Sequence, residues 1–352
     1  MSIITIDKLC MGGNGLGEVD GKKVFVPFSA PGDVIEIEIT KDHGSYAEAC
    51  LLEIIELSPS RVEPPCPVFG TCGSCQWQHI NYKTQLEWKQ IILKETLERI
   101  GKIEDPTVLP TLPSPKEWNY RNRMMLHVNS KGQVGFYKPK SKEVVEFERC
   151  YIAEEELNEQ LNAQREEISK RDRGISLRLK EGPHFAQVNN AQNEQMKKVI
   201  TQWISEVPHE TVVELYAGSG NFTFPIATVA ENVIAVEIDG RAVKWAREHA
   251  EMQGIKNITF HRLPSDRAKQ AFHEGSPDVV FLDPPRRGAA EAIDAIIDLK
   301  PSIIIYMSCD PATMSRDVHK LMESGWKFQK SLPVDMFPQT FHIESLTMLQ
   351  IQ

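Results

Sequence analysis

The chain has 352 residues, of which 41% are hydrophobic and 25% are charged, so we expect a globular protein of two or three domains. Its formal net charge of -9 argues against a generally basic nucleic-acid coat, although a local basic face can exist on an acidic protein. No signal peptide opens the sequence and no apolar run reaches the ~20 residues of a membrane helix, which predicts a cytoplasmic protein without membrane contact.

Residues 2–56 contain short strand-like segments separated by glycine-rich turns, and residues 33–40 alternate between polar and apolar side chains. Strands about ten residues apart predict a small β-barrel of the OB type. The turn at 12–17 and the segment Ala30-Pro31-Gly32-Asp33 resemble a TRAM domain, the small RNA-binding barrel attached to several RNA-modifying enzymes. A generic β-module without a role in RNA binding is the alternative.

A cysteine cluster follows a proline-rich linker at 58–65. Cys66, Cys72 and Cys75 have the spacing C-x5-C-x2-C, and Cys150 could supply a fourth thiolate. Four thiolates suit either zinc or an iron–sulfur cluster. Zinc sites more often use paired C-x2-C hairpins, and only one such pair is present, so the spacing alone leaves both open.

The middle of the chain alternates between helix and sheet patterns. An amphipathic helix is predicted over 79–103, with apolar side chains near one face and Gly101 at its end. Residues 119–150 predict an antiparallel sheet, and 154–170 predict a charged helix. A basic side of this sheet could lie on phosphates or be merely a solvated face; it comprises Arg121, Arg123, Lys138, Lys140 and Lys142.

From residue 193 onward, helices and strands alternate, which predicts a parallel sheet with helical crossovers. The strand at 211–216 runs into Ala217-Gly218-Ser219-Gly220, where glycine lets the backbone approach a ligand. The next strand ends in Glu237, about twenty residues on, a position from which a carboxylate can bind ribose hydroxyls. An adenosyl ligand is favoured over a plain turn, and the missing third glycine favours S-adenosylmethionine over NAD.

Two further strands end in polar motifs that predict the class of chemistry. The first ends in Asp283-Pro284-Pro285, as in amino-directed methyltransferases, but Arg286 stands where those enzymes carry an aromatic residue. The second ends in Ser308-Cys309-Asp310-Pro311. A thiolate at Cys309 could add to C6 of a pyrimidine and make C5 a carbon nucleophile. A small buried hydrophobic cysteine is the alternative.

Four segments together resemble the RNA 5-methyluridine methyltransferase family: 214–223, 282–286, 308–311 and 337–344. The resemblance extends over essentially the whole chain. It implies a 4Fe–4S cluster on Cys66, Cys72, Cys75 and Cys150, and an S-adenosylmethionine site formed by Gln187, Tyr216, Asn221, Glu237 and Asp283. It also implies that Cys309 is the nucleophile and Glu344 the base that removes the C5 proton. For the adenine edge, Arg262, Ser265 and Asp266 are all candidates, and Asp266 is our assignment.

The predicted fold is therefore α/β, with a Rossmann-like S-adenosylmethionine-dependent methyltransferase domain, an amino-terminal TRAM barrel and a central β-rich iron–sulfur domain. The barrel is predicted at 1–58. The central domain combines 59–78 with 110–183, and the catalytic domain combines 79–109 with 184–352.

The predicted function is methyl transfer to C5 of a specific uridine in RNA, through a covalent adduct between Cys309 and C6, by a monomer. The barrel favours 23S ribosomal RNA, because tRNA-directed bacterial relatives of this family commonly lack it. The alternatives are a tRNA T-loop uridine methyltransferase, an amino-directed nucleic-acid methyltransferase and a non-catalytic RNA-binding protein.

Overall fold

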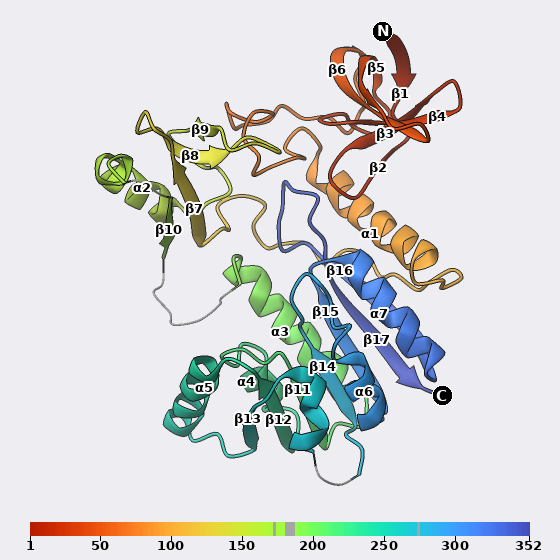
Figure 1. Cartoon of the computed structure of the whole chain (residues 1–352), viewed down its shortest axis with the longest axis vertical. Helices are drawn as coiled ribbons and strands as arrows, with labels where there is room; N and C mark the ends of the chain where they lie inside the picture. The colour runs from red at the N-terminus through yellow and green to blue at the C-terminus, as the bar shows by residue number, and fades with distance from the viewer. Residues whose placement is uncertain (172–173, 180–186, 273–274) are drawn as a thin grey trace.

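The computed structural model describes residues 1–171, 174–179, 187–272 and 275–352. Three separate sheets organise these residues, and they follow one another along the chain (Figure 1). The six-stranded sheet lies at the amino terminus, the four-stranded sheet in the middle and the seven-stranded sheet at the carboxyl terminus. Among the described residues, no helix is long and apolar enough to cross a membrane.

The amino-terminal sheet has the strand order β1-β5-β6-β4-β3-β2 and encloses its own apolar core, which includes Val24 and Ile35. Asp33 ties the end of this sheet to the linker, because its carboxylate accepts hydrogen bonds from the backbone N–H of Ser58 and from the Arg61 guanidinium. The strands are β1 (Ser2–Thr5), β2 (Lys8–Leu9), β3 (Gly15–Val19), β4 (Lys22–Val26), β5 (Val34–Asp42) and β6 (Tyr46–Glu56).

The central sheet has the order β10-β7-β8-β9, and the helix α2 (Glu155–Ser169) packs on one of its faces. Alternation along β7 explains this packing: Met124 and Leu126 are buried against Leu157 and Leu161 of the helix, in one apolar cluster. The strands are β7 (Arg123–Val128), β8 (Val134–Tyr137), β9 (Val144–Glu146) and β10 (Ile175–Arg178).

The carboxyl-terminal sheet has the order β13-β12-β11-β14-β15-β17-β16, in which β17 runs antiparallel to β15 and β16. Its central strands β14 and β15 are buried along their whole length, as expected for parallel strands covered by helices on both faces. The strands are β11 (Thr211–Leu215), β12 (Asn232–Glu237), β13 (Ile258–Arg262), β14 (Val279–Leu282), β15 (Ile303–Ser308), β16 (Trp326–Val334) and β17 (Glu344–Ile351).

The helices of this third part connect the parallel strands, which confirms the predicted α/β class. They are α3 (Asn190–Ser205), α4 (Thr223–Ile226), α5 (Gly240–Gln253), the 3-10 helix η1 (Ser265–Ala271), α6 (Ile293–Leu299) and α7 (Pro311–Glu323). The predicted boundary between 183 and 184 lies outside the described residues.

The helix α1 (Tyr82–Arg99) is shorter than the predicted 79–103, because Asn81 caps it by accepting a hydrogen bond from the Thr84 N–H. Its buried face also differs from the apolar pattern: Gln85 and Lys89 are fully buried, whereas Ile91 is exposed. The predicted face was wrong at these positions because α1 packs on a polar segment of the chain.

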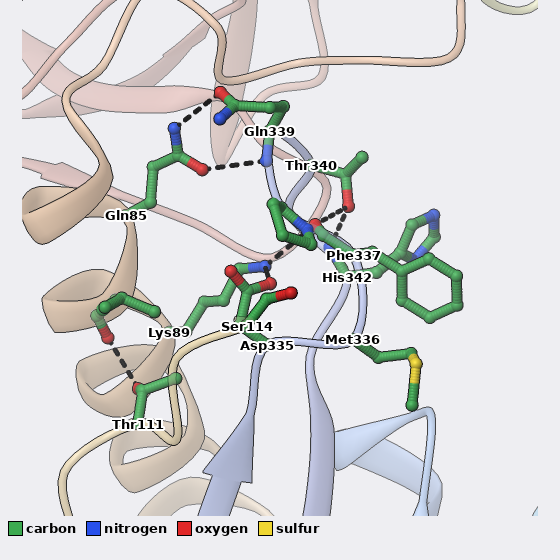
Figure 2. A network of polar contacts seen from close by, with 12 residues as sticks. Gln85, Lys89, Thr111, Ser114, Asp335, Met336, Phe337, Gln339, Thr340 and His342 are labelled. Carbon is green, nitrogen blue, oxygen red and sulfur yellow. Dashed lines mark hydrogen bonds and ion pairs between the residues drawn. The ribbon is translucent and has the colours of Figure 1, made fainter. Parts of the chain in front are cut away.

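That polar segment, residues 335–343, connects β16 to β17 and lies against α1 (Figure 2). The Lys89 ammonium donates to the Asp335 carboxylate at 2.5 Å and to the Phe337 carbonyl at 3.2 Å. Gln85 forms two hydrogen bonds with Gln339: its amide donates to the side-chain oxygen at 2.9 Å, and its own oxygen accepts from the backbone N–H at 3.0 Å. The segment is therefore fixed by buried polar contacts from a helix about 250 residues earlier.

We expect Lys89→Met to lower the free energy of unfolding by about 3–5 kcal/mol, because it leaves the Asp335 carboxylate buried without its cation. The double variant Lys89→Met/Asp335→Leu should recover most of this loss. Urea denaturation followed by circular dichroism measures both. The control is Lys94→Met in the exposed Lys94–Asp105 pair, which should cost less than about 1 kcal/mol. Equal losses for the two single variants would contradict this account.

Candidate active site at the carboxyl edge of the parallel sheet

The strand register brings Asp283, Cys309 and Glu344 to one edge of the third sheet. Leu215 pairs with Leu282, and Leu282 pairs with Tyr306, so the residues after β11, β14 and β15 leave the sheet side by side. Ser308 pairs with Ser345 in the antiparallel β15–β17 ladder. The next step along this register places Cys309 opposite Glu344, and Asp283 leaves the adjacent strand.

A cavity of about 470 Å³ opens at this edge. Five of the predicted cofactor residues line it: Gln187, Tyr216, Asn221, Glu237 and Asp283. Asp266 is exposed on η1 and does not line this cavity, so its contact with adenine stays a prediction. Polar residues that the sequence analysis did not assign to this cavity also line it, namely Arg123, Arg178, Glu214, Ser219 and Asp239.

The glycine turn after β11 shapes one wall of the cavity. Tyr216 has φ +61° and Gly218 has φ +55°, both in the left-handed region. A Cβ at Gly218 would have no atom within 4 Å, so the backbone presents open space there. Glu237 braces the turn, since its carboxylate accepts hydrogen bonds at 2.8 Å from the Gly218 N–H and the Asp239 N–H.

Hydrogen bonds hold the Asn221 side chain and the Gln187 backbone in the cavity wall. Asn221 and Asn193 of α3 exchange reciprocal amide hydrogen bonds at 2.9 and 3.0 Å. The backbone carbonyl of Gln187 accepts a hydrogen bond from the Asn122 amide at 2.8 Å. These hydrogen bonds therefore fix Asn221 and the backbone of Gln187 in the cavity wall.

The cavity contains acidic groups that burial makes easier to protonate. Burial raises the pKa of Asp283 to about 7. Burial, with a smaller effect of the Asp283 and Glu237 charges, raises the pKa of Glu214 to about 8. Among the described residues, Glu214 Oε2 and the Tyr216 hydroxyl are buried without a hydrogen-bond partner. Unused polar atoms beside an acid and an open glycine turn fit an adenosyl cofactor.

The charge of Glu344 acts on the thiol of Cys309. Glu344 is only 4% exposed, and burial followed by the Asp283 charge raises its pKa well above the ordinary value, with Arg286 opposing. Burial, then the charges of Glu344 and Asp283, raise the pKa of the Cys309 thiol to about 11, while Arg286 lowers it. In this state the thiol holds its proton at neutral pH.

His342 is a residue of this region that the sequence analysis did not assign. It lies two residues before Glu344, in the segment that α1 fixes (Figure 2). Burial, with the positive charges of Arg286, Lys89 and Arg121, lowers the pKa of His342 to about 4, so the imidazole is neutral at physiological pH. Because His342 lies two residues before a candidate base, the sequence alone could have indicated that it belongs to this region.

The four predicted metal-site cysteines surround a second, small cavity of about 20 Å³. Phe69, Phe136 and Phe147 complete its apolar walls. Burial raises the pKa of the Cys150 thiol to about 11. Within the described ranges, no group of three or more His, Cys, Asp or Glu residues is arranged to hold a metal ion. The structure thus brings Cys66, Cys72, Cys75 and Cys150 to one cavity without forming a site for a single ion.

Two models of known protein families match this chain, one in its amino-terminal part and one in its carboxyl-terminal part. A family model described as tRNA (Uracil-5-)-methyltransferase matches residues 155–352. A second model, described as the TRAM domain of tRNA (uracil(54)-C(5))-methyltransferase, matches residues 4–60.

Relatives match nearly the full length. An uncharacterized RNA methyltransferase of Bdellovibrio bacteriovorus is 33% identical, over 99% of this chain and 94% of the relative. The 23S rRNA (uracil(1939)-C(5))-methyltransferase of Shewanella sediminis is 30% identical, over 99% of this chain and 95% of the relative. The crystal structure of Pyrococcus abyssi tRNA (uracil-54, C5)-methyltransferase, in complex with S-adenosyl-L-homocysteine, has a TM-score of 0.75 at 24% identity. It covers 99% of this chain and 100% of that chain, which shows a shared fold.

We expect the alkylation of Cys309 by iodoacetamide to accelerate roughly tenfold per pH unit between pH 7 and 10, because only the thiolate reacts and its pKa is raised. Glu344→Gln should accelerate the reaction at pH 8, since it removes a negative charge that favours the thiol. Mass spectrometry of the Cys309 peptide gives the rate.

The matched control is Glu323→Gln, which removes an exposed carboxylate at the far end of α7 and should leave the rate unchanged. If Glu344→Gln also left it unchanged, the electrostatic coupling of Glu344 to Cys309 would be refuted.

Proposed function

Since the chain belongs to the tRNA (uracil-5-)-methyltransferase family, we propose that it transfers a methyl group from S-adenosylmethionine to C5 of a uridine in RNA through a cysteine adduct. The matches confirm the family, the amino-terminal TRAM domain and S-adenosylmethionine-dependent uracil-C5 methylation of RNA as predicted from the sequence. The amino-directed and non-catalytic alternatives are set aside on the same grounds.

The observation that carries the proposed mechanism is the strand register: β15, which ends just before Cys309, pairs with β17, which begins at Glu344, and with β14, which ends just before Asp283. Asp283 also lines the cavity of the glycine turn. In this proposal Gln187, Tyr216, Asn221, Glu237 and Asp283 hold S-adenosylmethionine, and the uracil lies between the cofactor and Cys309. S-adenosylmethionine supplies an electrophilic methyl group. The residues of the chain must therefore make C5 of the uracil a nucleophile.

Cys309 performs this activation. Its thiolate forms a bond to C6, and the electron pair of the 5,6 double bond moves to C5. C5 then bonds to the methyl group as the bond from that methyl to the sulfur of S-adenosylmethionine breaks, and the electron pair of that bond stays on the sulfur of the departing S-adenosylhomocysteine. C5 now carries the methyl group and its original proton. Glu344 removes that proton, the electron pair re-forms the double bond, and the bond from C6 to sulfur breaks to release the thiolate.

The position of Glu344 suits a base that acts on carbon. Burial and the nearby Asp283 charge raise its pKa, so its carboxylate binds a proton more tightly than an exposed glutamate does. Arg286 opposes this shift and also favours the thiolate of Cys309. Arg286 therefore takes a different role from the aromatic residue of the amino-directed enzymes.

For the RNA substrate we propose ribosomal RNA. In support, the Shewanella sediminis relative named for 23S rRNA matches over 99% of this chain at 30% identity. The solved structure named for tRNA is less similar in sequence, and a transfer-RNA uridine is the second candidate.

The target base must leave its stack to expose both faces, at a cost of a few kcal/mol. The monomeric state and the cytoplasmic location stay predictions.

We further propose a 4Fe–4S cluster on Cys66, Cys72, Cys75 and Cys150. The small apolar cavity that these four side chains line supports it. A single metal ion needs all its ligands within about 2.3 Å of one point, whereas in a cluster each thiolate binds its own iron, so wider spacing is required. The group would tie the loop at 66–75 to Cys150 in the central domain. We also propose the three domains predicted from the sequence: the barrel at 1–58, the central domain at 59–78 and 110–183, and the catalytic domain at 79–109 and 184–352.

The test of function uses unmodified transcripts of 23S rRNA and of tRNA with labelled S-adenosylmethionine. Wild-type protein should label 23S rRNA, and digestion should release 5-methyluridine. Cys309→Ala should give no product and no adduct. Glu344→Gln should slow turnover by on the order of a hundredfold to ten-thousandfold and retain RNA on the protein in a denaturing gel.

Glu323→Gln serves as the control and should behave as wild type. Labelling of tRNA alone would transfer the proposal to the second substrate. Product formation by Cys309→Ala would rule out the covalent mechanism, and full turnover by Glu344→Gln without a trapped adduct would remove Glu344 from the role of base.

The cluster is tested by metal analysis of protein purified without oxygen, which should contain about four iron atoms per chain. Cys72→Ser should lower the iron content and the thermal stability. Cys50→Ser, at a cysteine on β6 outside the small cavity, is the control and should change neither. One zinc per chain and no iron would reject the cluster.

A further inference from the structure

The turn at 285–289 carries Arg286, whose charge acts on both Cys309 and Glu344. Gly288 in this turn has φ +82°, in the left-handed region, and a Cβ added to it would lie 2.6 Å from the Asp317 carboxylate. Asp317 belongs to α7, the helix that begins two residues after Cys309. The turn therefore lies in close contact with the helix that follows the proposed nucleophile.

Buried hydrogen bonds join the turn to α7 and to β15. The Ala289 N–H donates to the Asp317 carboxylate at 2.7 Å and lies 3.0 Å from the Tyr306 hydroxyl. That hydroxyl donates to the same carboxylate oxygen at 2.9 Å. The Arg316 guanidinium donates to the other oxygen of Asp317 at 2.9 Å and to the Arg287 carbonyl at 3.1 Å. Asp317 is only 2% exposed, so these donors compensate its buried charge and fix the turn.

Tyr306 contributes to these contacts as a neutral donor. Its side chain is fully buried. Burial, then the charge of Asp317, raises the pKa of Tyr306, so the phenol keeps its proton throughout the physiological range. The hydrogen bond from Tyr306 to Asp317 is therefore present at every pH at which the protein would work.

The Thr313 hydroxyl connects the turn to the immediate neighbour of Cys309. It lies 3.2 Å from the Arg286 carbonyl and 3.2 Å from the Asp310 carbonyl. The backbone of Arg286 and the backbone next to Cys309 thus contact one side chain. We use the term Asp317 cluster for the four side chains that bind the turn: Tyr306, Thr313, Arg316 and Asp317.

The Asp317 cluster comes from the two elements that hold Cys309. Tyr306 lies in β15, three residues before Cys309, and the other three members lie in α7. Burial and the charges of Glu344 and Asp283 favour the thiol of Cys309, whereas the Arg286 charge favours the thiolate. Because the interaction of two charges weakens with distance, the effect of Arg286 depends on where the turn is held.

We propose that Asp317 and Tyr306 are positioning residues, which hold the turn so that the Arg286 guanidinium favours the thiolate of Cys309. They act through Arg286 and do not touch the reacting atoms. The proposal rests on the proposed function and deepens it, because it says how the fold of this chain makes the nucleophile available. A contribution to stability alone is the alternative.

The test measures the alkylation of Cys309 by iodoacetamide from pH 7 to pH 10, by mass spectrometry of the Cys309 peptide from the full chain. Asp317→Asn removes a negative charge, and this loss alone would favour the thiolate and accelerate alkylation. If Asp317 positions Arg286, alkylation at pH 8 should instead slow by about threefold to tenfold, with the pH profile displaced to higher pH. Tyr306→Phe removes no charge and should slow the reaction in the same direction.

A double-mutant comparison shows whether the effect passes through Arg286. Arg286→Gln alone should slow alkylation. Addition of Asp317→Asn or Tyr306→Phe to Arg286→Gln should then change the rate by less than about twofold, because the group being positioned is gone.

The matched control is Asp294→Asn, which removes an exposed carboxylate of α6 that pairs with Lys320 of α7. It should alkylate as wild type. Circular dichroism and thermal unfolding check that each variant is folded, and Tyr306→Phe, which loses one hydroxyl and keeps the ring, serves if Asp317→Asn does not fold.

Lower thermal stability with unchanged alkylation in the folded variants would overturn the proposal and leave the Asp317 cluster a structural role. Faster alkylation by Asp317→Asn would also overturn it, since that is the effect of the lost charge. An equal slowing in the Arg286→Gln background would show that the effect bypasses Arg286. Failure of the proposed function has a separate signature, because wild-type protein would then methylate no transcript while the alkylation rates still judge the positioning.

Discussion

The antiparallel pairing of β15 with β17 is the constraint on which the candidate active site depends. It places Glu344, at the start of one strand, opposite Cys309, just past the end of the other. The segment at 335–343 that leads into β17 is held by α1 through the buried Lys89–Asp335 pair and the Gln85–Gln339 hydrogen bonds. A small shift of this segment would separate the proposed base from the proposed nucleophile.

The same packing explains why the site carries so much buried charge. Asp283 and Glu344 are withdrawn from water beside Cys309, and burial favours the neutral form of each group. Arg286 counteracts this effect at both Cys309 and Glu344. A site of this kind is well suited to a reaction that must first create a thiolate and later remove a proton from carbon, because its protonation states change with small changes in the surroundings.

The three parts of the chain meet around this edge of the third sheet. The Tyr120 hydroxyl of the central part donates to the carbonyl of Pro338, and the backbone N–H groups of Gln76 and Trp77 contact the carbonyl of Gln339. Arg123 and Arg178 bring the central sheet to the wall of the cavity. The central part of the chain is thus connected by hydrogen bonds to the segment that leads to Glu344.

Local sequence already determined many features of the candidate active site. Buried strands, the glycine turn after β11 and the polar residues at strand ends depend on periodicity and on backbone geometry, so the positions of Tyr216, Glu237, Asp283 and Cys309 followed from reading along the chain. The cysteine spacing likewise predicted that Cys66, Cys72 and Cys75 lie together.

The burial of several residues and the pKa values of the site depend on tertiary structure alone. The sequence pattern placed Lys89 away from the apolar face of its helix, and only the contact with residues 335–343 explains the burial of Lys89 and of Gln85. The sequence left the adenine contact among Arg262, Ser265 and Asp266; in the fold Asp266 lies exposed, whereas Asp239 lines the cavity. Burial, then the Asp283 charge, raises the pKa of Glu344, and burial, then the charges of Arg286 and Lys89, lowers the pKa of His342. These properties depend on groups distant in sequence, because burial and electrostatic fields are sums over neighbours in space.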